Sequence, residues 1–225
     1  AEALSPTHHV LVGGRDAARI DDVIALCESA EAFRVDLDDA DALAAAVAGI
    51  ERLDVLVHSA GVIAHGPLTG TTTAEWERVL HTNVVAPATL TRLLLPALRA
   101  ASGLVVFINS GAGQSASANW SVYAASKFAL TALADSLRSE ERGIRVTSIH
   151  PGRVATDMQA ELNALEGRPY DPAKYLDPSA VARAVRLAGD LGEDGGIDSL
   201  PASSASAPSP ARRRSPAWPG RRRRR

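Results

Sequence analysis

Residues 104–140, LVVFINSGAGQSASANWSVYAASKFALTALADSLRSE, decide the fold class of this chain. The apolar run Leu104–Ile108 predicts a buried strand, and the Gly- and Ser-rich stretch after it predicts a loop. From about Tyr123 to Glu140, apolar residues recur at helical spacing and predict a helix. A buried strand that leads through a loop into a helix is typical of chains in which the two elements alternate.

The same alternation continues on both sides of this segment. Apolar runs predict strands near residues 9–13, 33–35, 55–57 and 146–149, and helical patterns cover residues 20–27, 40–50, 73–101 and 178–191. Parallel strands joined by crossover helices are buried on both faces. We therefore predict an α/β fold, a doubly wound, Rossmann-like parallel sheet between two layers of helices.

Length and composition predict one soluble domain, and the cysteine content predicts a reducing compartment. The chain has 225 residues, of which 46% are hydrophobic and 22% charged. No stretch reaches the roughly 18 consecutive apolar residues of a membrane helix. The first residues, AEALSPTHH, contain no secretory signal, and a single cysteine cannot form an internal disulfide. These features predict a cytoplasmic protein without a membrane partner.

The charge is distributed unevenly along the chain. Residues 201–225 hold eight arginines and no acid, so the preceding 200 residues carry a net charge of −10. An acidic body repels nucleic acid, because binding rests on cations that meet phosphates. The Ser-, Pro- and Arg-rich composition predicts a disordered tail over residues 196–225, after a domain of residues 1–195. Polyanion binding through this tail is the functional alternative to a merely solvated segment.

Tyr123 and Lys127 are the residues in the deciding segment that can carry chemistry. Their spacing of four places them on one face of the predicted helix. A phenol has a pKa near 10, and a nearby ammonium lowers that pKa. With Ser110 as a hydrogen-bond donor to a substrate oxygen, the set can move a proton to or from an alcohol or carbonyl. A packed tyrosine beside a solvated lysine would show the same spacing.

The segment FINSGAG to WSVYAASKFALTALADSL resembles the active-site region of the short-chain dehydrogenases/reductases, which also have a serine thirteen residues before the tyrosine. VLVHSAG (55–61), HTNVVAP (81–87) and HPGRVATDM (150–158) are similar to further motifs of that family, in the same order. The resemblance covers residues 3–191. It implies an NADP(H)-dependent oxidoreductase that interconverts an alcohol and a carbonyl on a small-molecule substrate.

The resemblance also implies roles for four residues of the catalytic site. Tyr123 would be the general acid/base, Lys127 would lower its pKa and hold the nicotinamide ribose, and Ser110 would orient the substrate carbonyl. Asn83 would support a water relay from Lys127. The alternative for Asn83 is a polar residue that tolerates a helix bend ahead of Pro87.

For the cofactor, the resemblance implies NADP(H). Arg15 stands where NADP-dependent members place a cation for the 2′-phosphate, and a guanidinium suits phosphate. Asp36 resembles the aspartate that contacts adenine, with a capping role as its alternative. His58 and Ser59 replace two usual asparagines, and no spacing of histidines suggests a metal site. The further expected contacts are the backbone of Leu37, the small residues Ser59, Ala60 and Gly61, the ribose-binding Tyr123 and Lys127, and the segment of Pro151 and Gly152.

Two further expectations concern parts of the family pattern that the sequence does not show. A first strand and glycine-rich turn, which bind pyrophosphate through amides at a helix N-terminus, have no counterpart, so a gap is expected between the strands near His9 and Val55. No final strand is expected after the last helix. A non-catalytic remnant that binds no cofactor is therefore the rival interpretation, and assembly into a homo-oligomer stays open.

Overall fold

The computed structural model describes residues 1–191 and 196–202, and its larger sheet has four parallel strands. Their order is β3 (Val55–His58), β4 (Leu104–Ile108), β5 (Arg145–Pro151) and β6 (Ser199–Ala202). Each neighbouring pair runs parallel. The helices of the described ranges include none with the length and apolar character that a bilayer crossing requires.

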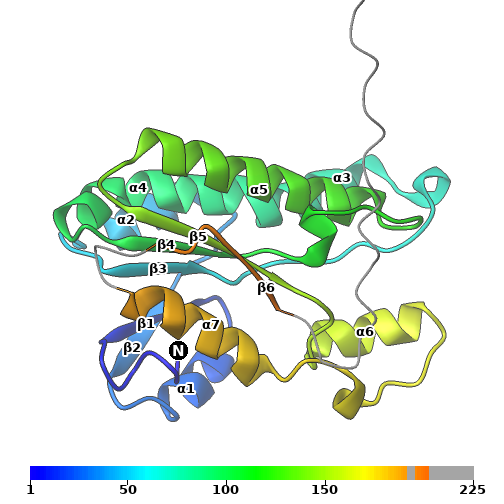
Figure 1. Ribbon diagram of the computed structural model, residues 1–225, viewed down its shortest axis with the longest axis horizontal. Helices are drawn as coiled ribbons and strands as arrows, with labels where there is room; N and C mark the ends of the chain where they lie inside the picture. The colour runs from blue at the N-terminus through cyan, green and yellow to red at the C-terminus, as the bar shows by residue number, and fades with distance from the viewer. Residues whose placement is uncertain (192–195, 203–225) are drawn as a thin grey trace, which may run out of the picture.

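Helices cover both faces of this sheet (Figure 1). On one face lie α3 (Thr73–Leu80), α4 (Ala86–Ala100) and α5 (Ser121–Glu140), and α2 (Ala40–Val47) contacts α4. On the other face lie α6 (Asp157–Leu165) and α7 (Pro178–Asp190). Separate apolar clusters fill the two interfaces, one around Leu98, Phe107 and Leu130 and one around Ile149 and Val185. The three-layer, doubly wound architecture predicted from the sequence is confirmed.

Two strands form a smaller sheet of their own. β1 (Val10–Gly14) and β2 (Ala30–Arg34) pair in parallel and are connected by α1 (Ala17–Ile24). No described strand joins β1 to β3 by backbone hydrogen bonds. The gap expected between these two strands is therefore present in the sheet topology.

The expectation that no strand follows the last helix is wrong. β6 pairs with β5, with Ile149 opposite Leu200, and Leu200 packs against the cluster beneath α7. The pairing satisfies backbone groups along the edge of β5, which a sequence rich in Ser, Pro and Ala does not reveal. The folded domain thus extends beyond residue 195 to at least Ala202. The arginine-rich segment and its predicted disorder lie outside the described residues.

The helical pattern predicted over residues 73–101 is interrupted by a π-helical turn. α3 begins with a capping box, in which the Thr72 hydroxyl and the Glu75 carboxylate each accept a backbone N–H of the other residue. Residues His81–Val85 then form the π turn before α4 begins. A π turn holds one residue more than an α turn and rotates the following helix. Asn83 lies inside this turn.

The carboxyl ends of β3, β4 and β5 meet at one edge of the larger sheet, as in all sheets whose strands run parallel. Segments that are distant in sequence therefore follow these strands side by side. They are residues 59–61 after β3, Ser110 after β4, and the Pro151–Gly152 segment at the end of β5.

Candidate active site

Helix α5 brings Tyr123 and Lys127 to the edge where β4 ends. The helix is held by its buried residues, among them Leu130, Ala134 and Leu137. Tyr123 lies in its first turn and Lys127 one turn later, and both side chains are buried. The predicted placement of both residues on one helix face is confirmed by the 5.7 Å between the Lys127 Nζ and the centroid of the Tyr123 ring.

Ser110 faces Tyr123 from the turn after β4. Its Oγ accepts a hydrogen bond from the backbone N–H of Ala112 at 3.1 Å, so the hydroxyl hydrogen is available for donation to another group. The Ser110 side chain is close enough to the phenol of Tyr123 to lower its pKa through hydrogen bonding. The structure therefore brings these two predicted site residues together.

The pKa of Tyr123 does not move in the expected direction. Burial raises the pKa of the phenol above its ordinary value, and the hydrogen bond with Ser110 opposes this only in part. The sequence led us to expect that Lys127 lowers this pKa. Desolvation of the phenol outweighs the stabilisation that Ser110 gives the phenolate, and the effect of Lys127 on this pKa stays a prediction.

Lys127 is itself deeply buried, with 5% of its surface exposed. Its Nζ donates a hydrogen bond to the Ile108 carbonyl at 3.1 Å. Burial lowers the pKa of this ammonium to about 8, so the group is still mostly charged at neutral pH. One of its three hydrogens is bound to Ile108, and the others can be donated to a ligand.

Asn83 is 1% exposed and its side chain is fully engaged. Its Oδ1 accepts the N–H of Val62 at 2.8 Å, and its Nδ2 donates to the Val62 carbonyl and to the Ser126 Oγ, each at 3.0 Å. It thereby ties the π turn to the loop after β3 and to α5. A Cβ on Gly61 would lie 3.4 Å from the Asn83 Oδ1 and 3.9 Å from the Lys127 Nζ, so Gly61 is next to both side chains.

Arg15 and Asp36 lie together after β1 and β2, at the smaller sheet. The Arg15 Nη1 is 3.9 Å from the Asp36 Oδ2, and 77% of the arginine side chain is exposed. The Asp36 Oδ1 also accepts the N–H of Asp38 at 3.1 Å within the turn, whereas the N-cap of α2 is Asp39, so Asp36 does not have the capping role considered as its alternative. Leu37 is half-buried beside them.

The remaining predicted cofactor contacts lie at the edge of the larger sheet. Ser59 and Ala60 are exposed and Gly61 is half-buried after β3. Pro151 is buried as the last residue of β5, and the N–H of Gly152 donates to the Ala202 carbonyl at 2.7 Å. That amide is therefore occupied by the strand β6.

His58, which replaces a usual asparagine, belongs to the core. Its ring stacks on Phe107 at 5.0 Å between centroids, and its Nε2 is 2.8 Å from the Thr91 Oγ1. Burial lowers the pKa of this imidazole to about 3, so the ring is neutral in the folded protein. Its hydrogen bond attaches β3 to α4.

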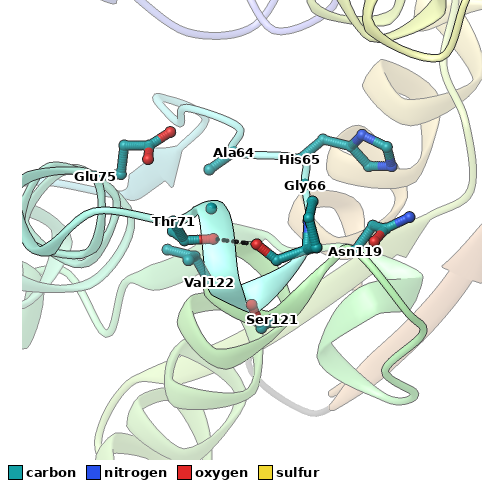
Figure 2. Close-up of a pocket in the computed structure, with 10 residues that line it drawn as sticks. Ala64, His65, Gly66, Thr71, Glu75, Asn119, Ser121 and Val122 are labelled. Atoms are coloured by element: carbon teal, nitrogen blue, oxygen red, sulfur yellow. Dashed lines mark hydrogen bonds between the residues drawn. The ribbon is translucent and has the colours of Figure 1, made fainter.

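A cavity of about 210 Å³ lies beside the start of α5. Its walls come from the loop at 64–71, from α3 through Glu75, and from Asn119, Ser121 and Val122 (Figure 2). His65 meets Trp120 edge-on at 5.0 Å, and Trp120 is tilted toward Tyr123 at 5.6 Å. The sequence analysis named none of these residues, because loops carry no periodicity that would place their side chains.

The chain is similar to proteins that are already known. The sequence profile described as short chain dehydrogenase matches residues 2–167. The chain is 35% identical over 174 residues to an uncharacterised NAD-dependent oxidoreductase of Mycobacterium tuberculosis, covering 68% of this chain and 63% of the relative. It is 36% identical over 133 residues to an uncharacterised oxidoreductase of Escherichia coli, covering 58% and 51%. The chain thus spans about half to two thirds of the length of these curated relatives.

Solved structures share the fold. A short-chain dehydrogenase from Streptomyces avermitilis is 31% identical, with a TM-score of 0.74 over 90% of this chain and 81% of that one. An alcohol dehydrogenase from Thermococcus sibiricus, complexed with 5-hydroxy-NADP, gives a TM-score of 0.82 over 92% and 91%. Its identity is 20%, so that likeness concerns the fold alone.

Proposed function

This chain belongs to the short-chain dehydrogenase family, and from that premise we propose that it is an oxidoreductase that interconverts an alcohol and a carbonyl with a nicotinamide cofactor. The observation that carries the proposal is that the buried side chains of Tyr123 and Lys127 share one face of α5, where Ser110 is close enough to act on the pKa of the phenol. A proton donor, a hydrogen-bond donor and a fixed positive charge are what proton transfer to a developing alkoxide requires.

In the direction of carbonyl reduction, the Ser110 hydroxyl donates a hydrogen bond to the substrate oxygen and orients it. Tyr123 then gives its phenolic proton to that oxygen, and the charge of Lys127 stabilises the phenolate that remains. The bound cofactor supplies the hydride in this direction and accepts it in the other. In the oxidation direction the phenolate takes the alcohol proton.

The described residues fit the nicotinamide half of such a cofactor. Lys127 is buried and has N–H groups left to donate after its bond to Ile108, which suits ribose hydroxyls. The exposed guanidinium of Arg15 suits a 2′-phosphate and favours NADP(H) over NAD(H), although Asp36 shares that site. For the pyrophosphate, the described residues present the backbone of residues 59–61 and no glycine-rich turn at a helix N-terminus.

We propose that Asn83 supports a water relay from Lys127, as the family resemblance implies. Its amide is already bonded to Val62 and Ser126. Pro87, four residues later, has no N–H to donate to the Asn83 carbonyl. The π turn compensates for this, since its hydrogen bonds join a carbonyl to the N–H five residues later, as from Ala86 to His81.

The proposal is tested by NADPH titration of this chain, followed by NADPH oxidation with a panel of small aldehydes and ketones. The expected result is carbonyl-dependent turnover that disappears in Tyr123→Phe. A chain that folds and binds no nicotinamide cofactor would support the rival interpretation of a non-catalytic remnant. Turnover that survives in Tyr123→Phe would remove the tyrosine from the mechanism.

A further inference from the structure

The turn that carries Ser110 is connected to helix α5 by buried side-chain hydrogen bonds around Asn109. Asn109 follows the last residue of β4 and is 4% exposed. Its backbone N–H extends the β4–β5 ladder by a bond to the Ile149 carbonyl at 2.8 Å. Its side chain contacts Ser110 on one side and Thr131 of α5 on the other.

The partners of Asn109 fix the direction of each hydrogen bond. The N–H of Ser110 is only a donor, so the atom 2.9 Å from it is the carbonyl Oδ1 of Asn109. The Nδ2 therefore donates to the Thr131 Oγ1, also at 2.9 Å. The single hydrogen of the Thr131 hydroxyl is shared between the carbonyls of Lys127 at 3.1 Å and Gly113 at 3.2 Å. A continuous chain of hydrogen bonds thus runs from Ser110 to the helix that carries Tyr123.

At position 113, the packing against these hydrogen-bonded residues leaves no room for a side chain. A Cβ on Gly113 would lie 2.6 Å from the Asn109 Oδ1 and 2.7 Å from the Lys127 carbonyl oxygen, both closer than real contacts. Only glycine lets the turn approach α5 this closely at position 113. The Nδ1 of His150 on β5 lies 3.0 Å from the Ser110 carbonyl and provides a further attachment for the turn.

We propose that Asn109 and Thr131 are positioning residues, which hold the backbone of Ser110 against α5 so that its hydroxyl stays within hydrogen-bonding distance of Tyr123. The inference rests on the proposed oxidoreductase function, because only there does the Ser110 hydroxyl act on a substrate. Neither residue touches the reacting atoms. Each acts through the location of Ser110 relative to Tyr123.

Kinetics of three variants test the proposal. Asn109→Ala and Thr131→Val are expected to lower kcat by about 10- to 100-fold, since misplacement of a reacting group by about 1 Å has effects of this size, with the Kd for NADPH unchanged. Thr131→Ser keeps the hydroxyl and is expected to restore kcat. If the serine variant is as slow as the valine variant, the hydroxyl is not what matters and the proposal is overturned.

A matched control separates positioning from general loss of stability. Thr91→Val also removes a buried threonine hydroxyl, the partner of His58, which lies on α4 and makes no hydrogen bond to the turn that carries Ser110. It is expected to lower the melting temperature without lowering kcat. An equal fall of kcat in Thr91→Val would mean that any lost buried hydrogen bond slows the enzyme, and that result would overturn the proposal.

A double-mutant cycle asks whether Asn109 acts through Ser110. In a Ser110→Ala background, Asn109→Ala is expected to cost no further kcat, because no hydroxyl remains to be positioned. An additive loss in the double variant overturns the proposal.

If the wild-type chain shows no turnover, the proposed function fails, and crystal structures of wild type and Thr131→Val still decide the positioning role. We expect the distance between the Ser110 Oγ and the Tyr123 Oη to increase in the variant. An unchanged distance rejects the proposal independently of activity.

Discussion

The ammonium of Lys127 lies 5.7 Å from the centroid of the Tyr123 ring and donates its hydrogen bond to the Ile108 carbonyl. The two residues therefore share one helix face, and no hydrogen bond joins their side chains directly. In the proposed mechanism, the charge of Lys127 acts on the phenol once the phenolate forms. In the resting protein, burial dominates and raises the pKa of Tyr123.

Replacement of Tyr123 by phenylalanine tests the proton-transfer role. The ring still packs in Tyr123→Phe, so we expect an unchanged fold, a cofactor affinity lowered by the one lost hydrogen bond to the ribose, and a loss of turnover of about 100-fold or more. Circular dichroism, NADPH titration and steady-state rates measure the three properties. Tyr175→Phe is the matched control, because its hydroxyl bonds to the Asn163 Oδ1 instead, and its kcat should equal that of wild type.

The lowered pKa of Lys127 predicts a pH-dependent stability. Between pH 8 and 10.5 the unfolded chain keeps the proton of this lysine and the folded protein has lost it. The unfolding free energy therefore gains up to about 1.4 kcal/mol per pH unit from Lys127 as the pH rises through this range. Urea melts of wild type and Lys127→Met should show this slope in wild type alone. Lys174→Met, which removes an exposed lysine, should keep it.

Arg15→Glu tests the preference for NADP(H). An anion in place of the guanidinium repels the 2′-phosphate, so the Kd for NADPH should rise by about tenfold or more, as a lost charge-assisted bond of about 1.5–3 kcal/mol implies. The Kd for NADH should change little. The control Arg19→Glu removes an equally exposed arginine that pairs with Asp16 and Asp157. Equal losses for both cofactors in Arg15→Glu would contradict the assignment of NADP(H).

The neutral core histidine predicts a loss of stability in acid. His58 keeps a pKa of about 3 in the folded protein, whereas the unfolded chain binds a proton at 6.5. As the pH falls from 6.5 toward 3, this residue lowers the unfolding free energy by up to about 1.4 kcal/mol per pH unit. In His58→Asn, thermal melts between pH 7 and 4.5 should depend less steeply on pH. The same dependence in both proteins would locate the acid sensitivity in other groups.

The parts of the fold that the sequence predicts well are those whose apolar pattern is set by burial. The strand Leu104–Ile108 and the helix after Tyr123 are examples, since each packs in the core of the larger sheet. β6 could not be predicted from its own residues, because Ser199–Ala202 becomes a strand only by pairing with the edge of β5. The pattern over residues 73–101 did not reveal the π turn, since both of its flanks remain amphipathic.

The same distinction holds for the site. The placement of Ser110, Tyr123 and Lys127 could be predicted, because Ser110 follows the end of a strand and the two other residues are one helical turn apart. The direction of the Tyr123 pKa was not readable, because it depends on how much water the folded protein excludes from the phenol. Asn109 and Thr131 are 22 residues apart, and only the folded turn brings their side chains together.

Because of the π turn at His81–Val85, the side chains of α3 and those of α4 are rotated about the helix axis relative to one another, with Asn83 between the two helices. Removing one residue from this turn would leave a continuous α-helix, apart from the bonds that Pro87 and Pro96 cannot donate, because an α turn needs one residue fewer than a π turn. Such a deletion would rotate all that follows by about 100° relative to what precedes it. Either Asn83 would leave Val62 and Ser126, or the buried side chains of α4 would leave the core. The additional residue in the π turn therefore lets Asn83 face Val62 and Ser126 while the buried side chains of α4 face the core.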